Sequence, residues 1–284
     1  MSTIDRAHCR REALGKALAW VAPGTWLLVV GLGLVLVGLV LGGCRGRGGD
    51  VLRVGVTPGP AEDLLHAVES GLARQGLHLD IVTFSDYVQP NMALASRDID
   101  ANLFQNTAFL NQFNRDHHTH FVSLCKVYLP LMAIYPGRAK TLAALSNGAR
   151  IAIPNDPVNH DRALLLLAKA KLLSVAQPDA MPLRIAANPR RMQLVELDAA
   201  QLPRSLDDAD AAVINANFAL DAGLSPASNA LFAETRESPY ANVLAVNLDG
   251  KSDPRFQTLA NALTSAEIRT RITAQYRGAI YPAE

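Results

Sequence analysis

The stretch that decides the fold is residues 51–82, VLRVGVTPGPAEDLLHAVESGLARQGLHLDIV. It opens with a mostly apolar run that ends at the turn residues 57–60, a pattern that predicts a strand. Apolar side chains then recur at helical spacing, at Leu64, Leu65, Val68 and Leu72. Residues 77–82 are again apolar at most positions and predict a second strand. A strand–helix–strand unit within one sheet implies a right-handed parallel crossover.

The same alternation continues along the chain. We expect further strands at residues 99–104, 121–128, 151–153, 194–197, 211–214 and 242–246, and helices at 90–97, 108–116, 158–173 and within 255–276. Strands that alternate with helices throughout predict the α/β class. The elements form two series, and the last strand and helices are free to return to the first. We therefore expect two lobes, one from residues 51–135 plus 238–284 and the other from 136–237.

The segment before this domain has the layout of an export signal. Its basic residues are Arg6, Arg10, Arg11 and Lys16, and an apolar run with glycines then extends over residues 26–42. The run is close to the lower limit of ~17–25 residues for a membrane-spanning helix. Length alone therefore leaves an uncleaved membrane anchor open.

The residues that follow favour a lipid anchor. Leu41-Gly42-Gly43-Cys44 resembles a lipobox, in which small residues precede a cysteine whose thiol receives diacylglycerol. We expect residues 1–43 to be a lipoprotein signal peptide, Cys44 to be lipidated, and the glycine-rich residues 44–50 to be a flexible tether. The predicted location is the extracytoplasmic, periplasmic face of a membrane. The alternative is a cysteine at the end of a transmembrane helix.

The charge balance and the cysteine content give no support for a nucleic-acid partner or for disulfide bonds. The chain has 27 Lys and Arg against 26 Asp and Glu; four bases and two acids precede Cys44, so 23 and 24 remain. This balance does not favour a nucleic-acid partner, which needs a basic patch. After loss of Cys9 and lipidation of Cys44 the remaining thiol is Cys125, in an apolar strand, where core packing is the expected role. The fold must then hold without disulfides.

Several segments carry a resemblance to a known family. They are residues 82–91, 98–105, 153–157 with Arg162, 196–208, 212–215 and 237–242. In this order they resemble the methionine-binding lipoproteins of the NlpA lipoprotein family, the substrate receptors of methionine ABC importers. The resemblance implies a two-lobed periplasmic-binding-protein-like fold (type II) with the ligand in the cleft between the lobes. It also implies three partners: L-methionine or a related amino acid, an ABC permease with its ATPase, and the membrane through the lipid anchor.

The resemblance also implies which residues bind the ligand. The predicted ligand-binding residues are Tyr87, Phe104, Asn106, Asn159, Arg162, Asn215 and Asn242. A guanidinium can grip a carboxylate with two nitrogens, which is the role expected of Arg162. Thioether sulfur packs well against aromatic rings, which is the role expected of Tyr87 and Phe104. The asparagines can serve the ammonium or the carboxylate.

The sequence departs from the family pattern next to this predicted site. Asn106 stands where His is common, Phe109 lacks the hydroxyl of a common Tyr, and Asp161 stands where Gly is frequent. A methionine derivative, the D-enantiomer, a methionyl peptide or another small apolar amino acid therefore stays open as the ligand. We expect that Asn106→His tightens binding of L-methionine.

Two other function classes are less favoured by the residues. A metal receptor could use His117, His118 and His120, but adjacent histidines in a strand-like run point apart, so we expect a solvated loop and neither a metal site nor a cofactor. An enzyme would need a nucleophile elbow, a phosphate-binding glycine loop or a Cys–His pair, and the sequence has no such motif. We therefore expect a transport receptor without catalytic residues.

Overall fold

The computed structural model describes residues 51–177 and 182–284. The predicted signal peptide (1–43), the tether (44–50) and the lipidation site Cys44 lie outside the described residues. None of the helices within these two ranges combines the length and the apolar character that crossing a bilayer requires.

The first lobe is built on a six-stranded sheet with the order β2–β1–β3–β12–β4–β13. Its strands are β1 (Val51–Val56), β2 (His78–Thr83), β3 (Ala101–Asn106), β4 (Phe121–Pro130), β12 (Asn242–Asn247) and β13 (Ile280–Pro282). β1 pairs in parallel with β2 and β3, as the strand–helix–strand pattern predicts. β12 returns from the end of the chain and lies antiparallel between β3 and β4.

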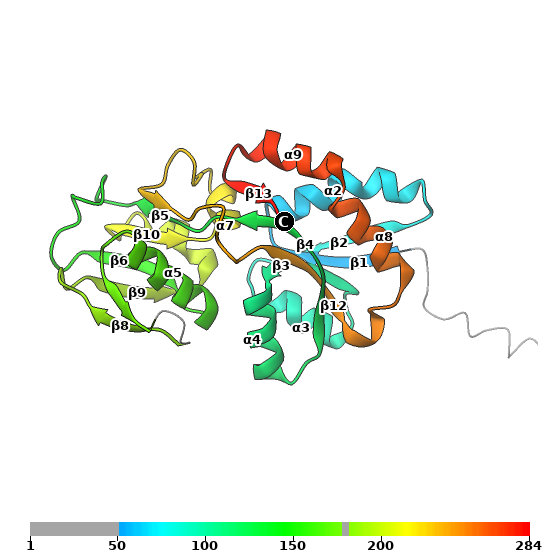
Figure 1. Ribbon diagram of the computed structural model, residues 1–284, viewed down its shortest axis with the longest axis horizontal. Coiled ribbons are helices and arrows are strands. Elements are labelled where there is room, and N and C mark those ends of the chain that lie inside the picture. The colour runs from blue at the N-terminus through cyan, green and yellow to red at the C-terminus, as the bar shows by residue number, and fades with distance from the viewer. Residues whose placement is uncertain (1–50, 178–181) are drawn as a thin grey trace, which may run out of the picture. The chain divides into compact units, whose positions relative to one another are not determined.

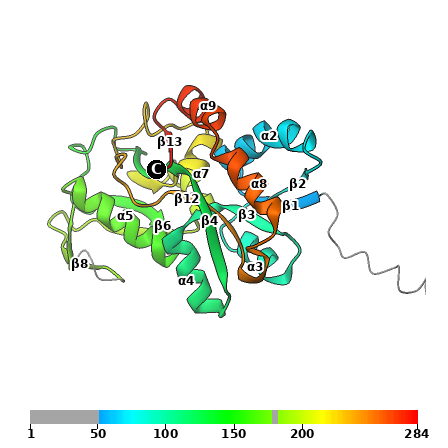
Figure 2. The same ribbon diagram turned by 45° about the vertical axis from the view of Figure 1, so that its right-hand side comes forward.

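Helices cover both faces of this sheet, with α3 and α4 below the strands and α2, α8 and α9 above them in Figure 2. These helices are α2 (Pro60–Ala73), α3 (Gln89–Ser96), α4 (Thr107–His117), α8 (Pro254–Leu263) and α9 (Ala266–Tyr276). Side chains of β12 alternate between the two faces, as the two-residue period of a strand requires. Leu244 and Val246 join the core under α2 and α8, whereas Val243 and Ala245 join the core under α3 and α4.

The second lobe contains a five-stranded sheet with the order β11–β5–β10–β6–β9, drawn in green and yellow in Figure 1. Its strands are β5 (Ala133–Pro136), β6 (Arg150–Pro154), β9 (Gln193–Leu197), β10 (Ala211–Ile214) and β11 (Phe232–Ala233), and a separate hairpin is formed by β7 (Ser174–Ala176) and β8 (Arg184–Ala187). Its helices are α5 (Pro157–Lys169), α6 (Leu202–Ser205) and α7 (Ala216–Asp221). Short 3-10 turns occur at Ala199–Gln201 and Leu248–Gly250.

The chain passes between the two sheets twice. The first passage is Leu131 and Met132, between β4 and β5, and both residues are buried. The second passage is residues 234–241, between β11 and β12. The expected division between residues 135 and 136 falls inside β5, which pairs with β10 and β11 of the second sheet.

The helix expected over residues 158–173 ends earlier, because α5 stops at Lys169. Lys171 has a positive φ of 60°, which an α-helix cannot contain. Leu172 and Leu173 are still buried in the core of the second lobe. Their apolar character therefore reflects burial after the helix has ended.

Candidate functional site

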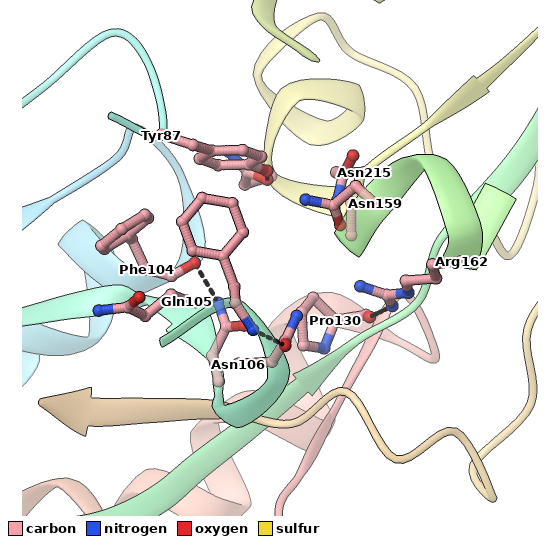
Figure 3. A pocket seen from close by; sticks show the side chains of 12 residues that line it. Tyr87, Phe104, Gln105, Asn106, Pro130, Asn159, Arg162 and Asn215 are labelled. Atoms are coloured by element: carbon pink, nitrogen blue, oxygen red, sulfur yellow. Dashed lines mark hydrogen bonds between the residues drawn. The ribbon is translucent and has the colours of Figure 1, made fainter. Parts of the chain in front are cut away.

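One cavity contains all seven predicted ligand-binding residues (Figure 3). It encloses about 340 Å³, including space at its mouth that is open to solvent, and side chains from both lobes line it. The first lobe contributes residues at the carboxyl end of β3, and the second lobe contributes residues that follow β6 and β10. Ligands of α/β proteins bind at such carboxyl ends of strands.

Three aromatic rings form the apolar side of the cavity. Tyr87, Phe104 and Phe109 lie with their ring centroids 5.9–6.0 Å apart. The Phe109 ring meets the other two edge to face, which is a favourable geometry for aromatic pairs. These rings can hold an apolar chain, and a thioether sulfur is especially suited to them.

Arg162 is buried in the cavity wall and already has a partner. Its Nε and Nη2 atoms donate to the two carboxylate oxygens of Glu234 at 2.8 and 2.5 Å. Nη2 also donates to the carbonyl of Pro130 at 2.8 Å, and the guanidinium lies 4.5 Å from the centroid of the Tyr240 ring. Burial alone would lower the pKa of Arg162, but the Glu234 charge outweighs it and the pKa is raised.

These contacts leave one guanidinium nitrogen for a ligand. Among the described residues no group accepts a hydrogen bond from Nη1 of Arg162. The two-nitrogen edge that we expect to grip a carboxylate is instead occupied by Glu234. Arg162 can therefore offer a ligand the two hydrogens of Nη1 in this arrangement.

The second polar group is a chain of three side chains that begins at the start of α5. Asp156 is the N-cap residue, and its Oδ1 accepts from the backbone N–H of Asn159 at 2.9 Å. The Asn159 amide donates to both Asp156 oxygens at 3.1 and 3.0 Å, and its Oδ1 accepts from Asn215 at 2.9 Å. Oδ1 of Asn215 is buried and has no hydrogen-bond partner in the part of the chain that the structure describes.

Asn106 and Asn242 lie at the opposite, first-lobe side of the cavity. Oδ1 of Asn106 caps α4 by accepting from the backbone N–H of Phe109 at 3.0 Å, which leaves its NH2 group as the donor for a ligand. Nδ2 of Asn242 donates to the Phe104 carbonyl at 2.9 Å and to the Tyr128 hydroxyl at 3.0 Å. Its free amide atom is therefore the oxygen.

Tyr87 links the two lobes. Its hydroxyl donates to Oδ1 of Asn217 on α7 at 2.5 Å, and its ring lies 5.0 Å from that of Phe218. Nδ2 of Asn217 in turn donates to Thr57 at 3.4 Å, directly after β1. Burial raises the pKa of Tyr87 well above its ordinary value, so the phenol stays a donor at neutral pH.

Sequence reasoning missed part of this cavity. Gln105, Phe109, Pro130, Ala216 and Asn217 also line it. Phe109 stands out in the sequence only as a departure from the family pattern, and α7, which carries Asn217, lies in no predicted element. Glu234 is also missed, because it is 72 residues from Arg162 in the chain and no local pattern joins the two.

The residues weighed for other chemistry lie elsewhere. His117 is exposed and stacks on Phe113 with ring centroids 4.1 Å apart, while His118 ends α4 with a φ of 53°. In residues 51–177 and 182–284 there is no group of three side chains that could hold a metal ion. Cys125 is half-buried against the first-lobe core, and burial raises its pKa to about 11.

Two α/β lobes joined by two passages, with a polar and aromatic cavity between them, define a substrate-binding protein of the periplasmic type. The family model for the NlpA lipoprotein matches residues 52–284. The chain belongs to the NlpA lipoprotein family, as the sequence segments predicted.

Relatives of known name agree with this class. The D-methionine-binding lipoprotein MetQ of Salmonella typhi is 38% identical over 256 residues, which cover 87% of this chain and 94% of that protein. A periplasmic substrate-binding protein of an ABC transporter from Coxiella burnetii is 44% identical with a TM-score of 0.78, over 82% of this chain and 100% of that chain. A nutrient-binding protein from Burkholderia cenocepacia, solved bound to methionine, is 38% identical with the same TM-score of 0.78, over 82% and 100%.

Proposed function

We propose that this protein is a lipid-anchored receptor that captures methionine, or a close relative of it, and delivers it to an ABC importer. The observation that carries the proposal is one cavity with three parts: an aromatic slot, a donor side with Arg162 and Asn106, and an unpartnered acceptor on Asn215. The relatives that are named for methionine binding, or solved with it, support the same ligand class.

The three parts correspond to the three parts of methionine. The carboxylate binds Nη1 of Arg162 and Nδ2 of Asn106, since both are hydrogen-bond donors that have no acceptor within residues 51–177 and 182–284. The ammonium binds Oδ1 of Asn215, and the thioether lies among Tyr87, Phe104 and Phe109.

Capture requires that the lobes open and close about the two passages. The bodies that move are the two sheets with their helices. The first boundary between the lobes along the chain therefore lies at residues 131–132, and the second lies within residues 234–241. A ligand that contacts both lobes favours the closed form by its differential affinity for it. The closed form then docks on the permease, whose ATPase subunits drive uptake. The receptor itself carries out no chemistry.

Calorimetry with the full-length protein in detergent tests the ligand. We expect L-methionine or D-methionine to bind more tightly than leucine, and a methionyl peptide or another apolar amino acid is the second candidate. Mass spectrometry of the ligand that co-purifies with the protein identifies it independently. Binding that depends on added zinc and is lost with a chelator would contradict the proposal.

Membrane attachment has its own test. Cys44→Ala removes the thiol that would carry the lipid, so we expect the protein to leave the membrane fraction or to accumulate unprocessed. Mass spectrometry of the mature amino terminus should show diacylglycerol on Cys44. Unchanged processing and unchanged membrane attachment of the variant would mean that an apolar helix holds the protein.

A further inference from the structure

We propose that Asp156 is a positioning residue that acts through Asn159 to hold Asn215 as a hydrogen-bond acceptor in the cavity, so that the site selects ligands with an ammonium group. The inference rests on the proposed function and identifies which part of the ligand the second lobe recognises. Asp156 itself does not line the cavity.

The argument starts from the carboxylate, which can only accept hydrogen bonds. Because Asn159 faces both oxygens of Asp156, it must turn its NH2 group toward them. A flipped Asn159 would place its own oxygen against a negative charge. The orientation of this amide is therefore determined by Asp156.

The same reasoning passes to the next side chain. Oδ1 of Asn159 faces Asn215, so Asn215 must donate from its NH2 group. The distance from Nδ2 of Asn215 to Oδ1 of Asn159 is 2.9 Å. The oxygen of Asn215 is then the amide atom of this cavity-lining side chain that has no partner among the described residues. Asn215 is only 6% exposed, and among the described residues its buried oxygen has no hydrogen-bond partner, although buried polar groups are normally hydrogen-bonded.

An oxygen held in this way discriminates between ligands. An ammonium group supplies three hydrogens and a positive charge, whereas a carboxylate oxygen would be repelled. A hydroxyl can donate one hydrogen but lacks the charge, and hydrogen bonds to charged groups are the stronger ones. The ligand must then place its carboxylate on the donor side, at Arg162 and Asn106.

The test compares L-methionine with its 2-hydroxy analogue, 2-hydroxy-4-(methylthio)butanoate. The measured quantity is the ratio of the two dissociation constants for the full-length protein in detergent. Wild type should prefer methionine, and Asp156→Asn should reduce the ratio at least about tenfold, since Asn159 can then flip and Asn215 can present its NH2 group. Asparagine is also a good N-cap, so α5 should still form.

Two further variants separate the effect of the hydrogen-bond chain from Asp156 through Asn159 to Asn215 from the effect of the Asp156 charge. Asn159→Leu interrupts the chain of hydrogen bonds but keeps the Asp156 carboxylate, and it should reduce the ratio as much as Asp156→Asn does. The double variant Asp156→Asn with Asn215→Asp has a carboxylate at 215, which accepts whichever way Asn159 turns, and it should restore the preference for methionine.

Asp161→Asn is the matched control, because Asp161 is a buried carboxylate on the same helix that accepts from the backbone of Leu183. It should leave the ratio unchanged. An unchanged ratio in Asp156→Asn, or a loss in that variant without one in Asn159→Leu, would overturn the positioning role. If wild type binds neither compound, the proposed function fails instead.

Discussion

Arg162 and Glu234 are bound to each other before any ligand arrives. Nη2 of Arg162 donates to the Pro130 carbonyl, and the Glu234 carboxylate accepts from the backbone N–H of Met132 at 3.0 Å. Pro130 directly precedes the first passage between the lobes, Met132 lies in it, and Glu234 begins the second passage. One ion pair therefore ties both passages together beside the cavity.

The pair predicts opposite effects of two substitutions on ligand affinity. Arg162→Ala should weaken methionine binding by about 2–5 kcal/mol, because a buried ligand carboxylate loses its partner. Glu234→Gln should strengthen binding, because the ligand becomes the main counter-ion of the guanidinium. Calorimetry on both variants measures this, and an unchanged ligand affinity in both would mean that the pair serves stability alone.

Arg162→Ala should also destabilise the protein. Glu234 would remain as a buried carboxylate without its cation, which costs about 3–5 kcal/mol of the free energy of unfolding. Denaturant titration without ligand measures the loss. A variant as stable as wild type would show that water or a neighbouring group reaches Glu234.

Cys125 should be unreactive in the folded protein. Its pKa of about 11 leaves only about one thiolate in a thousand at pH 8, and the thiolate is the nucleophile. Alkylation by iodoacetamide at pH 8, followed on the Cys125 peptide by mass spectrometry, should be at least about 100-fold slower than in denaturant. The rate should rise about tenfold per pH unit up to pH 10, and a rate independent of pH would contradict the shift.

At the residue scale the sequence indicated positions but not pairings. All seven predicted residues line one cavity. Their prediction was possible largely because the resemblance to the family indicated these positions. Their orientations depend on partners far along the chain, such as Glu234 for Arg162 and Asn159 for Asn215. Asn106 is an example of a residue whose position was predicted but whose partner was not, because its oxygen caps α4 by accepting from the backbone of Phe109. Asn106→His would remove that cap, so the expected gain in methionine affinity must be weighed against lost helix stability of about 1 kcal/mol.

Elements with a clear period were predictable, and most of the short strands were not. The strands and helices of the first lobe, from β1 to β4, all correspond to predicted segments within a few residues. β5, β7, β8, β11 and β13 contain two to four residues each and correspond to no predicted strand, because a two-residue alternation cannot be recognised over so few residues. They form because neighbouring strands offer them hydrogen bonds, a cause that lies outside their own sequence. β10 is also four residues long, but it was predicted as a continuous apolar run.

Two glycines predict opposite effects on stability. A Cβ on Gly137, just after β5, would meet the carbonyl oxygens of Ala209 and, at 2.9 Å, of Leu206. Since these are backbone atoms, Gly137→Ala should lower the free energy of unfolding by about 1–3 kcal/mol. Gly71 lies within α2 and its nearest neighbour would be an Arg74 nitrogen at 3.9 Å. Gly71→Ala should therefore raise the free energy of unfolding by about 0.5–1 kcal/mol.

Denaturant titration of the two variants checks this pair at once. The two substitutions add the same methyl group, so a difference in sign isolates the surroundings as the cause. Equal shifts for both glycines would show that the strand β5 can move away from the segment around Ala209.

At the scale of the whole molecule, Asn217 connects the lobes through Tyr87 and Thr57. Asn217→Ala removes these contacts but leaves both cores intact. We expect methionine affinity to fall by about 1 kcal/mol and the average molecule to be more open. Calorimetry gives the first quantity and small-angle X-ray scattering gives the second.

Asn188→Ala is the control for this effect. Asn188 also makes two hydrogen bonds, to the backbone N–H and carbonyl of Met192, but both lie within the second lobe. The variant should lose stability and keep its ligand affinity. Equal losses of affinity in the two variants would mean that Asn217 acts on the stability of its own lobe.

The place of β12 in the first sheet has a consequence for how the protein is made. β12 fills the position between β3 and β4, yet it is synthesised after the entire second lobe. Nearly the full chain must therefore leave the ribosome before the middle of that sheet can form. Until then, the edges of β3 and β4 that pair with β12 stay without their partner strand. For a lipoprotein with the export signal predicted at residues 1–43, this delay would be an advantage, because a chain that cannot fold early is still unfolded when it reaches the translocation machinery.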